Sequence, residues 1–97
     1  MPETVQLYAD LAGSQRDTLW AVYHYDRSTP RTIAGVLPSS YQTIYNAIDR
    51  LEDESLVETE AHPTDGRQRV VTCTERGKQV LADRQKWERG GPEVADA

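Results

Sequence analysis

The chain has 97 residues, of which 37% are hydrophobic and 28% are charged, and its formal net charge is −5 at pH 7. This length allows one domain with a single modest core, and the apolar content is too high for a disordered chain. Because the sequence has no bilayer-length apolar run, no leader pattern and only one cysteine, we expect a cytoplasmic protein without a membrane segment or disulfide.

The negative charge is concentrated in one stretch of the chain. Residues 49–60 hold six acidic side chains and one arginine, a sum of −5, so the rest of the chain is balanced. An acid-rich surface in a chain without phenylalanine is typical of a high-salt cytoplasm, where charges are strongly screened. The composition therefore favours a halophilic protein whose other surfaces are close to neutral.

The first half of the chain predicts an arm and two helices. Residues 1–13 form the arm, which packs on the core or on a second subunit. The first helix begins in a capping box at Ser14 and fades near Tyr25. The second, short helix begins at Thr29-Pro30, because Thr29 can cap it and Pro30 has no N–H that needs a partner.

A third helix follows after a turn. It begins at a second capping-box pattern, Ser39 with Gln42, and runs to about Glu54. Its apolar residues recur every three or four positions and define a stripe that we assign to the core, namely Tyr41, Ile44, Ile48 and Leu51. Tyr45 lies off this stripe and is placed at the surface.

The second half of the chain predicts a hairpin and a last helix. Residues 57–61 alternate as a half-buried strand does, residues 69–73 are β-branched, and Asp65-Gly66 marks the turn between them. Thr74 then caps a helix. The predicted fold is thus α+β, with a three-helix core, a two-stranded β-wing and a C-terminal helix over residues 14–89, followed by a flexible tail over residues 90–97.

Helix, turn, helix and an arginine-tipped hairpin is the order of a winged helix-turn-helix, which offers one helix to the major groove of DNA. Hydroxyl and amide side chains at the start of the third helix can read base edges, and arginines beside the hairpin turn can enter a minor groove or clamp phosphates. We therefore predict sequence-specific binding to double-stranded DNA, with Arg31 and Arg50 as weaker candidates at the edges. The predicted DNA-contacting residues are Ser39, Ser40, Gln42, Thr43, Tyr45, Asn46, Arg50, Arg67 and Arg69.

Apolar residues near both ends of the chain have no obvious intrachain partner. They suggest a homodimer formed through the first and last helices, which implies a roughly palindromic DNA site. The candidate interface residues are Leu7, Leu11, Trp20, Leu81 and Trp87.

Other classes of function have weaker support. His24, His62 and Cys73 fall in no catalytic motif, and they lack metal-ligand spacing. We therefore predict no enzyme, no metal and no cofactor. A winged helix that contacts proteins instead of DNA stays open, because fold does not fix function. A uniformly acidic face around the third helix and the hairpin tip would favour that alternative.

Several short pieces resemble the PadR-like branch of winged-helix regulators, in particular its haloarchaeal and phage repressor-like members. The pieces are residues 10–20, Ile44-Tyr45, Leu51-Glu52, Leu56-Val57, Asp65-Gly66-Arg67 and Thr74-Glu75-Arg76-Gly77. The resemblance implies transcriptional control by a homodimeric repressor, with Ser40, Thr43 and Tyr45 on the recognition helix and Arg67 as the wing arginine.

Two features depart from that resemblance. Glu54-Ser55 stands where relatives usually have a glycine, so we expect a differently built turn into the wing. The C-terminal part is also shorter than the long dimerising helices of many PadR proteins.

Overall fold

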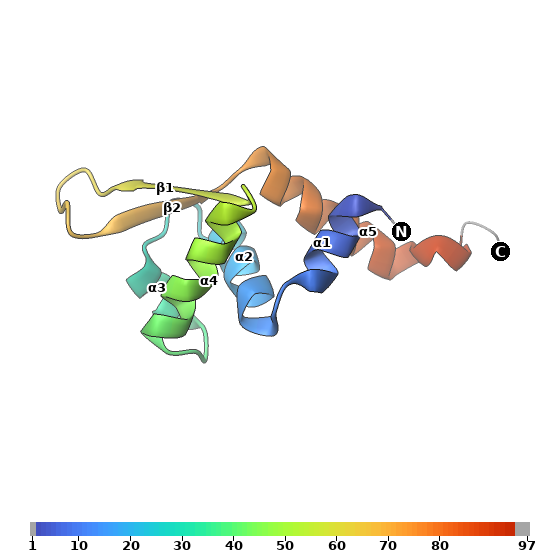
Figure 1. Cartoon of the computed structure of the whole chain (residues 1–97), viewed down its shortest axis with the longest axis horizontal. Coiled ribbons are helices and arrows are strands. Elements are labelled where there is room, and N and C mark those ends of the chain that lie inside the picture. Colours follow the sequence, from blue (N-terminus) through green and yellow to red (C-terminus); the bar gives the residue numbers. More distant parts are fainter. Residues whose placement is uncertain (1, 95–97) are drawn as a thin grey trace.

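The computed structural model describes residues 2–94, which form five helices and one antiparallel pair of strands (Figure 1). The elements are α1 Glu3–Asp10, α2 Gly13–His24, α3 Pro30–Val36, α4 Tyr41–Asp53, β1 Val57–Ala61, β2 Arg69–Cys73 and α5 Glu75–Val94. The hairpin projects at one end of the molecule, and α5 extends toward the other. This arrangement confirms the predicted α+β winged helix.

The core lies between α2, α3, α4 and the base of the hairpin. Its central side chains are each at most 2% exposed, and they are Leu19, Val22, Ile33, Ile44, Ile48, Leu51, Leu56, Val57, Val71, Val80 and Leu81. β1 and β2 pair in register from Val57–Cys73 to Ala61–Arg69, so their inner ends supply valines to this core. Burial of these apolar groups fixes the wing on the helical body.

The stripe predicted for α4 is correct except at its first residue. Ile44, Ile48 and Leu51 are buried, and Ala47 is buried with them. Tyr41 was assigned to the core, but its side chain is 49% exposed. It is the first residue of α4, and its ring lies beside Tyr45, with 5.9 Å between ring centroids, instead of reaching the body.

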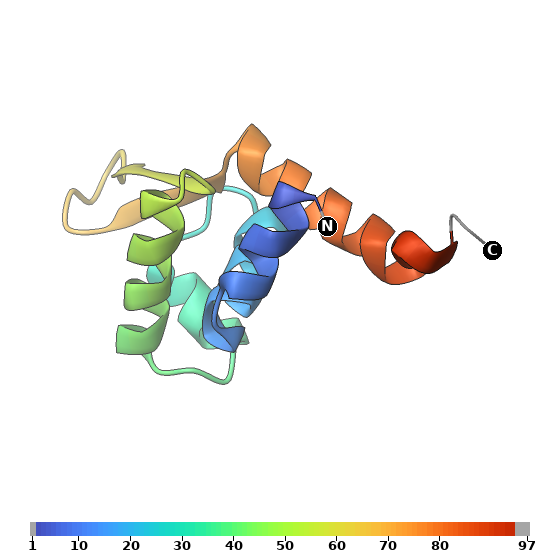
Figure 2. The same cartoon turned by 45° about the vertical axis from the view of Figure 1, so that its right-hand side comes forward.

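The arm predicted for residues 1–13 contains helix α1, which packs on α5 (Figure 2). Thr4 donates a hydrogen bond of 2.6 Å to Asp83, and the guanidinium of Arg84 lies 5.1 Å from the Tyr8 ring centroid. Both contacts tie the start of the chain to its last helix. The arm therefore covers the protein's own core.

This packing corrects part of the predicted dimer interface. Leu11 and Leu81 are each only 2% exposed within the chain itself, so they have no surface for a second subunit unless the core opens. Leu7 and Trp20 pack on the same core but are partly exposed. Trp87 is half-buried on α5.

The start of α2 lies slightly earlier than predicted. The helix begins at Gly13, and Gln15 accepts a hydrogen bond of 2.9 Å from the backbone N–H of Ala12. Ser14, the predicted cap, lies inside the helix, where its carbonyl accepts from Thr18. The start of α3 is as predicted, with the Thr29 side chain accepting from the N–H of Thr32 and Pro30 first in the helix.

The turn between α4 and β1 is built without glycine, as expected. Ser55 adopts a left-handed conformation with φ of 61°, and the N–H of Leu56 reaches back to the carbonyl of Leu51 at 2.9 Å. This geometry closes the end of α4 in the way that a glycine usually does. It also directs the chain at once into the first strand of the wing.

The C-terminal helix begins at a strong cap. The hydroxyl of Thr74 accepts from the N–H of Gly77 at 3.0 Å and donates to the carbonyl of Ser55 at 2.7 Å. α5 continues to Val94, so residues 90–94 of the predicted tail are helical, and residues 95–97 lie outside the described part. None of the helices in residues 2–94 combines the length and apolar character needed to cross a membrane.

Candidate nucleic-acid interface

The first turn of α4 is exposed and capped by a serine. The side chain of Ser40 accepts a hydrogen bond of 3.1 Å from the N–H of Thr43 and also bonds the Thr43 hydroxyl at 2.9 Å. The predicted cap, Ser39, lies one residue before the actual cap and is half-buried. The helix start thus presents backbone N–H groups and small hydroxyls to solvent, which suits an approach to a polar, anionic surface.

An amide pair continues this polar face. The side chain of Gln42 donates to the side-chain carbonyl of Asn46 at 3.0 Å, and both residues are exposed. The pair leaves the side-chain carbonyl of Gln42 and the NH₂ group of Asn46 for an outside partner. Arg50 lies one turn further along and is half-buried, so it is at the edge of this face.

The tip of the wing carries Arg67, whose side chain is 94% exposed. Asp65 accepts hydrogen bonds from the side chain of Gln68 at 3.1 Å and from the N–H of Arg67 at 3.1 Å. These two bonds, that of Gln68 first, lower the pKa of the Asp65 carboxyl from its usual 3.8. At neutral pH the ionised carboxylate therefore holds the tip turn closed while Arg67 projects into solvent.

Arg69 is the first residue of β2, at the tip end of the strand pair, and contacts α4. Its guanidinium lies 5.2 Å from the centroid of the Tyr45 ring, and its Nη1 lies 3.5 Å from a carboxylate oxygen of Asp49. This contact leaves Tyr45 half-buried, whereas the sequence predicts a surface position for it. α4 and the wing are thus joined by a cation that lies over an aromatic ring.

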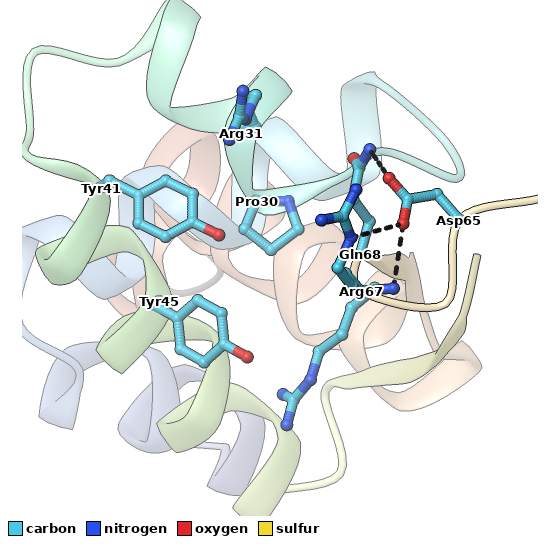
Figure 3. A pocket seen from close by; sticks show the side chains of 8 residues that line it. Pro30, Arg31, Tyr41, Tyr45, Asp65, Arg67 and Gln68 are labelled. Carbon is cyan, nitrogen blue, oxygen red and sulfur yellow. Dashed lines mark hydrogen bonds and ion pairs between the residues drawn. The ribbon is translucent and has the colours of Figure 1, made fainter.

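A groove of about 380 Å³ opens between the helix start and the wing (Figure 3). Its lining residues come from the starts of α3 and α4 and from the wing, and they are Pro30, Arg31, Tyr41, Tyr45, Asp65, Arg67, Gln68 and Arg69. In Figure 3 the hydroxyls of Tyr41 and Tyr45 point across the groove toward the wing. Tyr41 is exposed because it forms one wall of this groove.

The two sides of the wing differ in charge. The groove beside α4 is lined by three arginines and one aspartate, a net charge of +2. A second groove, along the strands and the end of α4, is lined by Glu52, Glu58, Glu60, Glu75 and a single arginine, a net charge of −3. Three acids of the stretch, Glu52, Glu58 and Glu60, therefore line a different groove from Arg67, whereas Asp49 lies beside Arg69. The total of −5 does not describe the surface around Arg67.

The predicted DNA-contacting residues fall into two groups in the structure. Those on the exposed start of α4 and those beside the groove lie around one surface: Ser40, Gln42, Thr43, Tyr45, Asn46, Arg67 and Arg69. Ser39 and Arg50 lie at its edges. Sequence reasoning missed Tyr41, because its spacing matched the buried stripe, and Asp49, because it was counted only as part of the acidic stretch.

Cys73 and the histidines have no place in this surface. Burial raises the pKa of the Cys73 thiol to about 11, so it is protonated at neutral pH. Within residues 2–94, no three histidine, cysteine or acidic side chains are grouped closely enough to hold a metal ion. The Nδ1 of His62 accepts from the N–H groups of Thr64 and Asp65 and lies 3.3 Å from the Thr64 hydroxyl, all within its own turn.

Solved structures with the same fold include several transcriptional regulators. The PcaV regulator from Streptomyces coelicolor has a TM-score of 0.72 at 23% identity over 75% of this chain and 52% of its own. A structure described as MarR has a TM-score of 0.77 at 20% identity, over 94% of this chain and 66% of its own. An S. aureus MepR mutant bound to an oligodeoxyribonucleotide has a TM-score of 0.75 at 23% identity, over 87% of this chain and 64% of its own.

The chain spans about half to two thirds of the length of these structures. No match was found among curated proteins. Residues 9–68, more than half of the chain, match the sequence profile of the MarR family. The resemblance to winged-helix regulators is thus confirmed at the level of the fold, and the family profile that matches is that of MarR instead of the PadR branch. The chain belongs to the MarR family.

Proposed function

We propose that this chain binds double-stranded DNA in a sequence-specific manner and regulates transcription, as a repressor. α4 would lie in the major groove, and the wing would contact the adjacent minor groove or its phosphates. The observation that carries this proposal is the common exposure of the capped helix start and Arg67 around one arginine-lined groove. The regulators with this fold, and the oligonucleotide bound to MepR, support it.

Selection of bound sequences from a random duplex pool, at two salt concentrations, tests this proposal. We expect one enriched motif at both salt concentrations, with weaker overall retention at the higher one, because phosphate contacts release counterions and base contacts do not. A pool that stays random at both concentrations would contradict sequence-specific binding.

The protein-binding alternative finds less support in the charges. It required a uniformly acidic face around the third helix and the hairpin tip, whereas the groove there carries a net charge of +2. The acidic groove on the other part of the wing would repel a duplex. We therefore place DNA on the α4 side and keep the acidic side facing solvent.

We further propose a homodimer and a high-salt cytoplasm as its setting. The dimer is supported by the projection of α5 beyond the body and by partly exposed Trp87 on it. The salt setting is supported by the acidic stretch, whose mutual repulsion is screened at high ionic strength. A melting temperature that rises between low and molar KCl is expected, and one that falls would oppose the second proposal.

A further inference from the structure

The groove between α4 and the wing has the chemistry of a site for a single phosphate group. Three arginines line it, and two tyrosine hydroxyls point into it from one wall (Figure 3). Arginine and hydroxyl donors are the groups that bind phosphate oxygens in protein–DNA complexes. Asp65, the one acid in the lining, is occupied by Gln68 and Arg67 of its own turn.

Arg69 is already held in position for an anion. Its guanidinium rests on the Tyr45 ring at 5.2 Å, which fixes the plane of the cation, and it is 39% exposed. Its Nη1 is buried without a hydrogen-bond partner within the described residues, although a carboxylate oxygen of Asp49 lies 3.5 Å away. The buried Nη1 stays beside Asp49, and the exposed part of the guanidinium can donate to an oxyanion in the groove. The ordering cost is small, because the stacking on Tyr45 and the pairing with Asp49 already hold the side chain in place.

The position of the groove identifies the source of the phosphate. One wall is the start of α4, and the other is the wing. In a winged helix these two elements contact neighbouring grooves of the duplex, and a sugar–phosphate strand always runs between the major and the minor groove. A backbone phosphate on that strand would face the space between them.

We propose that this groove seats one phosphate of the DNA backbone, with Arg69 as the fixed cation and the hydroxyls of Tyr41 and Tyr45 as donors. This inference rests on the proposed DNA-binding function and adds to it the register of the protein on the duplex. Arg31 and Arg67 at the rim would contact the same strand to either side. The seat fixes orientation, and base contacts from α4 supply the sequence preference.

Neutral methylphosphonate linkages, placed one at a time along the selected duplex, test this phosphate-binding site. We expect one linkage beside the major-groove site to weaken binding of the wild-type protein by roughly tenfold to a hundredfold, as loss of a charge-assisted hydrogen bond does. Tyr45→Phe keeps the ring beneath Arg69 and removes only the hydroxyl. On unmodified DNA it should weaken binding, and on DNA with that one linkage it should weaken binding little further.

The matched control is Tyr23→Phe, since Tyr23 is an exposed tyrosine on α2, outside the groove. This variant should bind both duplexes with nearly the affinity of the wild type. If the linkage and Tyr45→Phe reduce the affinity for DNA independently, so that their factors multiply, the groove does not bind that phosphate. The proposed DNA binding itself would still stand. A chain that selects no DNA would instead overturn the proposed function.

Inorganic phosphate, compared with chloride at equal ionic strength, separates a DNA phosphate from a free one. For a backbone seat we expect equal melting temperatures in both salts for the wild type and for Tyr45→Phe. A different result would overturn the assignment to DNA. In that case phosphate raises the melting temperature of the wild type alone, and the affinity losses from the linkage and from Tyr45→Phe multiply. The groove would then bind a free anion.

Discussion

Arg67 is the most exposed cation at the tip of the wing, and its backbone is fixed by Asp65. We expect Arg67→Ala to weaken binding by a similar factor on all duplexes and to reduce the slope of log K against log salt by about one. Titrations at several salt concentrations measure both quantities. Unchanged affinity together with an unchanged slope would remove the wing from the interface.

Ser55 holds the left-handed conformation that glycine adopts without strain. Ser55→Gly should therefore raise the free energy of unfolding by about 1 kcal/mol, because a side chain in this region costs roughly that amount. The Thr74 contact is to the backbone carbonyl of residue 55, so it is retained. Urea unfolding measures the change, and a decrease in stability would show that the serine side chain contributes more than its strain costs.

At the scale of the elements, α4 presents its amide pair to the proposed major-groove contact. Replacing Gln42 or Asn46 by Ala should cost about 1–3 kcal/mol at the selected site and little on random duplexes, if either side chain reads a base. Their mutual hydrogen bond of 3.0 Å couples the two, so the double variant should lose less than the sum of the singles. Equal losses on both kinds of DNA would assign them to positioning.

The junction of β2 with α5 depends on a close approach at Gly77. A Cβ there would overlap the carbonyl of Leu56 and come within 2.8 Å of the Cys73 sulfur. Gly77→Ala should destabilise the fold by about 1–3 kcal/mol, since backbone cannot move aside as a side chain can. Gly35→Ala on α3 is the control.

A Cβ at residue 35 meets nothing within 4 Å, and residue 35 is helical. Gly35→Ala should therefore leave the free energy of unfolding unchanged or raise it by up to about 1 kcal/mol through helix propensity. Chemical unfolding of both variants decides the matter. Equal changes in the two would mean that helix propensity, and not the contact with Leu56, governs position 77.

The elements that the sequence predicted well are those set by local chemistry. Thr29-Pro30 allowed only one helix start, and the hairpin followed from alternation and the Asp65-Gly66 turn. Adjacent serines gave α4 two possible caps, and spacing alone could not choose Ser40 over Ser39. Tyr41 kept the spacing of the buried stripe but lies one turn before the helix reaches the body, which only the tertiary arrangement determines.

The sequence predicted the polar residues of the candidate site but not the contacts that join α4 to the wing. The stacking of Arg69 on Tyr45 and its pairing with Asp49 join residues that are 20 or more positions apart. No local pattern encodes such a pair, because it depends on how the wing folds back on α4. The same limit applies to Leu11 and Leu81, whose burial depends on α1 packing against α5.

At the scale of the whole molecule, the proposed DNA side and the assembly side lie at opposite ends of a body 53 Å long. The hairpin tip is at one end, and α1 with the later turns of α5 is at the other (Figures 1 and 2). A second copy joined at the α1–α5 end would thus leave both wings accessible. Such two-fold symmetry predicts two half-sites about one helical turn apart, or a multiple of it.

Sedimentation in high salt, where the acidic stretches repel one another least, should show twice the mass of the chain. Trp87→Ala should shift the equilibrium toward the monomer, because Trp87 is half-buried on the projecting part of α5 and a buried indole is a frequent interface anchor. Tyr25→Ala, an exposed aromatic at the end of α2, should leave it unchanged. A monomer at high concentration would reject the dimer, and the selected DNA would then contain one half-site instead of a palindrome, so the two measurements must agree.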